Sequence, residues 1–115
     1  MANQVSFKLV LPSAGVAYQT SEYFSIAGYS RYSIAYLAEG EADVDWSLET
    51  TSIPRLGTTS VPSEEDAEWF NDNSDTAYVD SWSNNVANEI LDKWARIRYI
   101  STDTATLTVV ITLQE

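Results

Sequence analysis

The chain has 115 residues, of which 44% are hydrophobic and 12% aromatic, so it is long and apolar enough to bury one core and is not disordered by composition. Its formal net charge is −11 with only six basic residues, which argues against nucleic acid and anionic membranes as partners, because both are bound through Lys and Arg. No apolar run approaches the ~20 residues of a membrane span, and the N-terminus lacks the pattern of a secretory signal.

Cysteine and histidine are both absent. The lack of cysteine excludes disulfides, thiolate nucleophiles and Cys-based zinc sites. The lack of histidine excludes the Ser-His-Asp and Cys-His arrangements and removes the commonest metal ligand. The four glycines lie far apart, so no glycine-rich phosphate loop is present either.

The first half of the chain shows repeated period-two alternation. Residues 5–11 are predicted to form a half-buried strand that Pro12 stops, and residues 16–20 a shorter one. Residues 32–38 and 43–49 form two stronger strands around a turn at 39–41, where Gly40 supplies a left-handed backbone position. We expect these two strands to pair as a hairpin. In the first strand Tyr32, Ile34 and Tyr36 would share one face, and in the second Val44, Trp46 and Leu48 would share one face.

The middle of the chain is less regular. Ser63 is a suitable helix N-cap with acidic residues after it, so residues 62–70 are predicted to form one or two helical turns, preceded by a short strand at 58–61. Residues 71–75 are predicted to be a polar loop and residues 77–83 a strand. Residues 84–93 fit a helix, a strand or a loop about equally well.

The C-terminal residues 94–100 and 106–114 alternate again around a short polar break, which predicts a second hairpin. In its second strand Leu107, Val109, Ile111 and Leu113 should face the core near Ile34 or Trp46. In its first strand Ala95, Ile97 and Tyr99 should face inward, opposite Trp94, Arg96 and Arg98.

About eight strands without a long crossover helix argue for antiparallel sheets. The predicted fold is therefore a single all-β domain over residues 1–115, an antiparallel β-sandwich with a jelly-roll-like topology, preferred over an immunoglobulin-like one, and one short helical turn.

Acidic residues supply the only candidates for chemistry. Asp43, Asp45 and Glu49 share one strand face, where carboxylates suit a glycosidase, a calcium site or simply the wet face of an edge strand. The oxygen-rich residues 71–75 lack the Gly and terminal Glu of an EF-hand loop. We therefore expect no enzyme activity, no catalytic or cofactor-binding residues, no metal site and no cofactor.

The outward stripe of Trp94, Arg96 and Arg98 is the candidate protein interface, because Trp and Arg are enriched in interfaces. Alternatively, the two arginines offset nearby acidic strands. The other aromatic residues either fill the core or form a row that stacks on sugar rings.

Three segments, residues 44–50, 94–99 and 106–114, resemble the strands of small β-sandwich modules of tailed bacteriophage virions, such as decoration, cement, fibre-base and adaptor proteins. Discoidin-like sugar-binding sandwiches have similar strands. The resemblance implies a multi-copy structural protein of the virion without catalysis, made in the host cytoplasm.

The function expected from this resemblance is that of an acidic capsid decoration or cement protein, which binds the assembled head surface. Its partners would be the major capsid protein or another virion protein, and it would form a homo-oligomer, with a trimer favoured. The alternative is a carbohydrate-binding β-sandwich module used in host recognition, and a weaker third is an enzyme using paired carboxylates.

Overall fold

The computed structural model describes residues 4–51, 69–87 and 93–115. In these ranges all regular structure is β, and no helix is present that would be long and apolar enough to cross a membrane. The strands are β1 (Gln4–Ser13), β2 (Gln19–Thr20), β3 (Phe24–Ser25), β4 (Arg31–Gly40), β5 (Val44–Thr51), β6 (Phe70–Ala77), β7 (Ser83–Ala87), β8 (Trp94–Ser101) and β9 (Ala105–Gln114).

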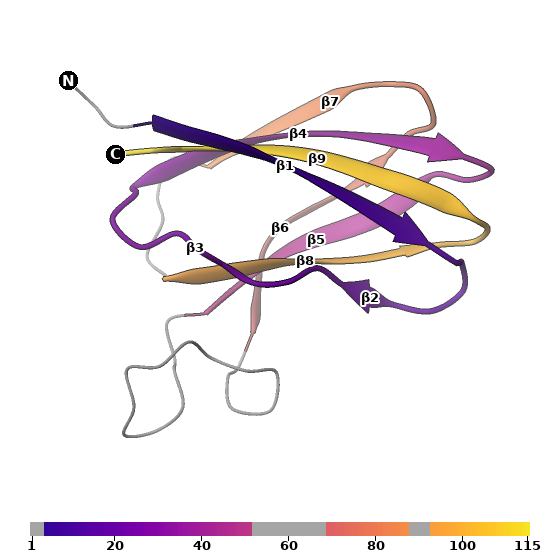
Figure 1. The fold of residues 1–115 in the computed structure, drawn as a ribbon, viewed down its shortest axis with the longest axis horizontal. Coiled ribbons are helices and arrows are strands. Elements are labelled where there is room, and N and C mark those ends of the chain that lie inside the picture. Colours follow the sequence, from indigo (N-terminus) through magenta and orange to yellow (C-terminus); the bar gives the residue numbers. More distant parts are fainter. Residues whose placement is uncertain (1–3, 52–68, 88–92) are drawn as a thin grey trace.

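The strands form two antiparallel sheets that face each other (Figure 1). Sheet A has the strand order β1-β9-β4-β7, and sheet B has the order β2-β8-β5-β6, with β3 also paired to β8. The long strands alternate buried and less buried residues, as expected when each sheet turns one face to a shared core. The prediction of an all-β antiparallel sandwich is confirmed.

The core lies between the sheets. Ile111 of β9 pairs with Ile34 of β4, and both side chains are buried. Tyr36 of β4 meets Trp46 of β5 edge to face, with ring centroids 4.7 Å apart, so these two rings join the sheets. The predicted inward residues of the last strand are all buried: Leu107, Val109, Ile111 and Leu113.

Both predicted hairpins are wrong, because each connects strands of different sheets. β4 belongs to sheet A and β5 to sheet B, and β8 and β9 are divided in the same way. A short break rich in Gly or in Ser, Thr and Asp ends a strand both in a hairpin within one sheet and in a crossover between two sheets. Here the chain crosses to the other sheet, so that the apolar faces of both strands meet the same core. The two crossovers pack together, since a Cβ on Gly40 would lie 3.0 Å from Ala105 Cα, and Glu41 N–H donates to Thr104 O over 3.0 Å.

The predicted polar loop at residues 71–75 is also wrong, because these residues belong to strand β6. β6 pairs with β5 alone among the described strands, so its side chains need little apolar character. The register shifts opposite Leu48 and Glu49, which leaves Asp72 as the extra residue of a bulge. The bulge lets both Asp72 and Asp75 reach sheet A, although strand residues at an odd spacing ordinarily point to opposite faces.

The predicted helical turn at residues 62–70 and the strand at 58–61 fall mostly on residues 52–68, outside the described ranges; Phe70 already belongs to β6. The strand predicted at residues 77–83 is largely wrong: β6 ends at Ala77 and a turn follows, in which Ser81 N–H bonds to Tyr78 O over 3.3 Å. The undecided stretch at 84–93 begins as strand β7.

Candidate functional site

The predicted phase of strand β8 is confirmed. Ala95, Ile97 and Tyr99 are buried, whereas Trp94, Arg96 and Arg98 lie half-buried on the outer face of sheet B. β8 is an inner strand of this sheet, between β5 on one side and β2 and β3 on the other. Side chains of the neighbouring strands therefore surround the stripe, and its residues differ in what they contact.

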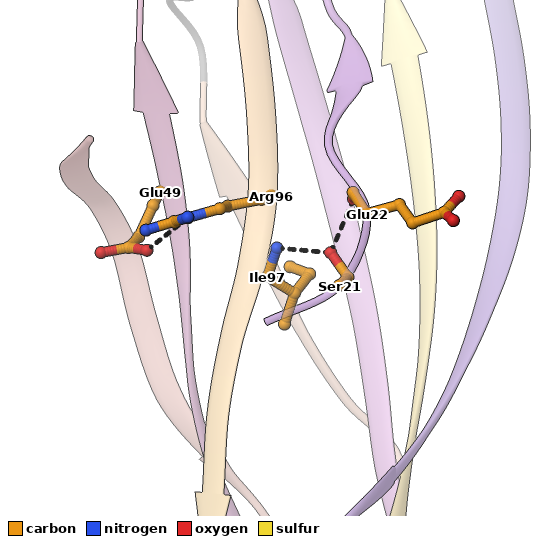
Figure 2. Close-up of polar contacts among 5 residues, drawn as sticks. All are labelled: Ser21, Glu22, Glu49, Arg96 and Ile97. Atoms are coloured by element: carbon orange, nitrogen blue, oxygen red, sulfur yellow. Dashed lines mark hydrogen bonds and ion pairs between the residues drawn. The ribbon is translucent and has the colours of Figure 1, made fainter. Parts of the chain in front are cut away.

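Arg96 is held within the molecule. Its Nε donates to Glu49 Oε1 of β5 over 2.9 Å, and both side chains are largely covered, with 13% and 14% of their surface exposed (Figure 2). The guanidinium also lies 4.5 Å above the ring of Trp69. Arg96 thus links strands β5 and β8, and little of it is open to a partner.

Ser21 fixes the segment between β2 and β3 on the other side of β8 (Figure 2). Its Oγ accepts a hydrogen bond from Ile97 N over 2.9 Å and donates to Glu22 O over 2.9 Å. Tyr23, two residues on, contacts both Trp94 and Trp69, with ring centroids 6.2 and 6.3 Å apart. This end of the outer face is therefore an aromatic cluster rather than an open patch.

Arg98 has a different environment. Its guanidinium lies 3.7 Å from the ring centroid of Tyr18, and within the described part of the chain it has no hydrogen bond or ion pair to another side chain. It borders a depression of about 410 Å³ between the β2 side and the β5–β6 side of the face. The depression is also lined by Tyr18, Asp45, Ser47, Asn71, Ser74 and Thr76.

The three acidic residues that were predicted to share a strand face each make a separate contact within the fold. Asp43 Oδ1 accepts from Val79 N over 2.9 Å, Asp45 Oδ1 accepts from Thr76 Oγ1 over 2.6 Å, and Glu49 pairs with Arg96. No group of three or more acidic residues suited to hold a metal occurs in the ranges that the structure describes. The carboxylates therefore connect β5 to its neighbours.

Two tyrosines of β4 reach across the sandwich to the acidic residues of β6. Tyr32 O–H donates to Asp72 Oδ2 over 2.6 Å, and Tyr36 O–H donates to Asp75 Oδ2. Burial, and next the hydrogen bond to Asp72, raises the pKa of Tyr32. Burial, and next the hydrogen bond to Asp75, raises the pKa of Tyr36 to about 12. Asp72 and Asp75 thus accept hydrogen bonds from phenols of the opposite sheet.

The opposite outer face, which we call the A face, is poor in charge. It consists of the outward residues of β1, β4, β7 and β9, and its charged members are Lys8, Arg31 and Glu39. The rest are small, apolar or β-branched residues and amides: Gln4, Ser6, Val10, Pro12, Ser33, Ala35, Leu37, Asn84, Val86, Thr106, Thr108, Val110, Thr112 and Gln114.

The sequence pattern identified Arg98 but missed Tyr18 and the side chains of β6. No protein-family model matches the chain, and no curated protein matches it significantly. Among solved structures it is similar to a chain described under "Bacillus endospore appendages form a novel family of disulfide-linked pili", with a TM-score of 0.51 and 13% identity over 99% of this chain and 88% of that one. At that identity the similarity concerns the fold alone.

Proposed function

We propose that this chain is a non-enzymatic structural protein that binds, as a homo-oligomer, to an assembled protein surface, namely that of a virion head. The observation that carries the proposal is the A face. A chain with a net charge of −11 repels its own copies, so an interface between copies must lie where acidic groups are scarce. Glu39 is the one acidic residue among the described positions of this face.

The A face also offers apolar area for contact. Val10 and Val86 are 57% and 59% exposed. Thr108, although it points outward, is only 5% exposed, because Val10 and Leu37 stand beside it on the paired strands. A sheet face of this kind can bury contiguous area against another protein surface, and exposed apolar patches rimmed by polar groups commonly mark such contacts.

We also infer a jelly-roll topology. It is supported by the two strand orders, β1-β9-β4-β7 and β2-β8-β5-β6, in which the strands of each sheet are mostly distant in sequence. Jelly rolls occur in viral capsid proteins and lectins, so the topology suits both the virion role and the carbohydrate-binding alternative.

The similarity to a pilus protein adds limited support, since it means that a sandwich of this fold can be built into a repeating appendage. The pili are described as disulfide-linked, whereas this chain has no cysteine. Its assembly would therefore have to rest on non-covalent contacts. A surface such as the A face would have to supply the binding free energy.

The stripe of Trp94, Arg96 and Arg98 becomes the second candidate interface. Arg96 is engaged with Glu49, so replacing both arginines by Glu would disturb the fold as well as any interface. The A face allows a cleaner test, because Val10 is well exposed and its side chain has room for a carboxylate.

The test compares Val10→Glu with Ala27→Glu, which adds the same charge in an exposed turn between β3 and β4. Sedimentation velocity over a concentration series measures self-association, and co-sedimentation with particles of the virus that encodes the chain measures decoration. We expect the parent and Ala27→Glu to associate alike and Val10→Glu to bind about tenfold more weakly, or ~1.4 kcal/mol. If the parent stays monomeric and does not co-sediment with the particles, the proposed function is wrong. If Val10→Glu behaves like the parent, the A face is not the interface.

A further inference from the structure

We propose that the outer face of sheet B binds a neutral glycan, in a trough centred on Tyr18 and Arg98. The proposal goes beyond the structural role and does not depend on it, because the trough and the A face lie on opposite outer surfaces of the sandwich. It assigns the carbohydrate-binding chemistry to specific residues.

Two adjoining depressions form the trough. The first, of about 410 Å³, lies beside Arg98, and the second, of about 720 Å³, extends past Val16 and Ile100. Both are lined by Tyr18, Asp45 and Thr76, so these three residues stand where the depressions meet. Tyr18 is 58% exposed as a residue, and the Arg98 guanidinium covers one face of its ring, which leaves the other face for a ligand.

The side chains match the chemistry of a sugar. A pyranose presents an apolar C–H face, which stacks on an aromatic ring, and several hydroxyls that both donate and accept. Tyr18 supplies the ring, and Arg98 supplies guanidinium donors that no described side chain occupies. Asp45 supplies carboxylate acceptors, of which Oδ1 is already bonded to Thr76. Further hydroxyl and amide groups come from the first depression: Ser47, Asn71 and Ser74.

The charge of the trough specifies a neutral glycan. One basic residue, Arg98, lines the two depressions, against three acidic ones: Glu41, Asp43 and Asp45. Asp75 also lines the first depression, but its carboxylate is turned to Tyr36 of sheet A. A sugar carboxylate or sulfate would therefore enter a negative field, although Arg98 alone would attract it. Neutral hexoses and N-acetylhexosamines meet no such penalty.

The segment that carries Tyr18 is held in place before any ligand arrives. Val16 has a positive φ of 57°, which is unusual for a β-branched residue, and its N–H donates to Ser101 O over 2.7 Å. The buried hydroxyls of Ser13 and Ser101 are 2.7 Å apart, and β2 begins one residue after Tyr18, where Gln19 pairs with Tyr99. A backbone fixed in this way, with the Arg98 guanidinium stacked on the ring, limits the conformational freedom that Tyr18 loses on binding, which favours affinity.

The experiment is a glycan array followed by titration calorimetry with the best neutral ligand. Tyr18→Ala and Arg98→Ala are compared with Tyr78→Ala, a tyrosine that is similarly exposed at 53% and lines neither depression. We expect the parent and Tyr78→Ala to bind the same neutral glycan, and the two trough variants to bind at least tenfold more weakly. Urea unfolding of each variant verifies that the fold is kept, and Arg98→Lys provides a milder second probe that keeps the charge but loses the planar fork.

Three outcomes overturn the proposal: no glycan binds at millimolar concentration, only acidic glycans bind, or the trough variants bind like the parent. None of them bears on self-association or particle binding, so this inference and the proposed function succeed or fail separately.

Discussion

The two outer faces of the sandwich differ in what holds their side chains. On the A face, small and β-branched residues stand in rows across paired strands, such as Val10, Thr108 and Leu37, with few charges. On sheet B, an ion pair joins Arg96 to Glu49, and each arginine of β8 stacks on an aromatic ring. The A face is thus suited to contact with another protein surface, while the outer face of sheet B is held by contacts among its own side chains and contains a depression. Both faces lie over the same core, so the difference between them arises from the alternate residues of each strand that point outward.

The largest expected effect compares neighbouring residues of β9 that face opposite ways. Ile111→Ala removes a buried side chain and should lower the free energy of unfolding by ~2–5 kcal/mol. Val110→Ala, on the A face, should lower it by less than ~1 kcal/mol, because Val110 is only partly covered. Urea unfolding monitored by tryptophan fluorescence measures both. Equal losses would mean that the A face is covered like the core, and the contrast between the faces would be lost.

An intermediate effect is expected from reversing one charge on each face. Arg96→Glu places a second carboxylate against Glu49 in a largely covered position and should destabilise the fold by ~3 kcal/mol. Lys8→Glu, its counterpart on the A face, should change stability by less than ~0.5 kcal/mol, since Lys8 is exposed. Adding Glu49→Arg to Arg96→Glu should restore part of the loss. If Arg96→Glu lowers the free energy of unfolding as little as Lys8→Glu does, the ion pair between Arg96 and Glu49 does not stabilise the fold.

The smallest effect concerns Tyr36, which connects β4 of sheet A to Asp75 on β6 of sheet B. Its folded pKa is raised from 10.0 to about 12, so its protonated form is favoured by folding. The resulting stabilisation is fully present below pH 10 and is lost as the pH rises from 10 to about 12, because the unfolded chain releases the proton first. Tyr36→Phe should cost ~1 kcal/mol at neutral pH and flatten this alkaline decline.

The alkaline decline is measured by urea midpoints at several pH values from 8 to about 12. Tyr18→Phe is the control, since Tyr18 is exposed and its hydroxyl has no partner in the described part of the chain. A decline of the same slope in Tyr36→Phe and in Tyr18→Phe would show that the hydrogen bond to Asp75 does not link the sheets.

The sequence predicted the strands and core residues where apolar residues alternate, as at Ile34, Trp46 and Ile111. It failed at strand β6, whose Asp72 and Asp75 are polar because buried phenols of another sheet bond to them. It also failed at both crossovers, because a turn signal marks the end of a strand but not the sheet that the next strand joins. For the site, the outward phase of Arg98 followed from β8 alone. The depression beside it did not, since Tyr18 and β6 reach it through pairings distant in sequence.

Strand β9 lies between β1 and β4, with Gln114 paired to both Gln4 and Arg31, so the first and last described strands run side by side (Figure 1). A ribosome delivers β1 and β4 long before residues 105–114. Until then both strands lack the neighbour that satisfies their backbone groups, and the apolar face of sheet A has no central strand. Sheet A should therefore form only after residues 105–114 have been synthesised, and the domain should fold slowly for its size.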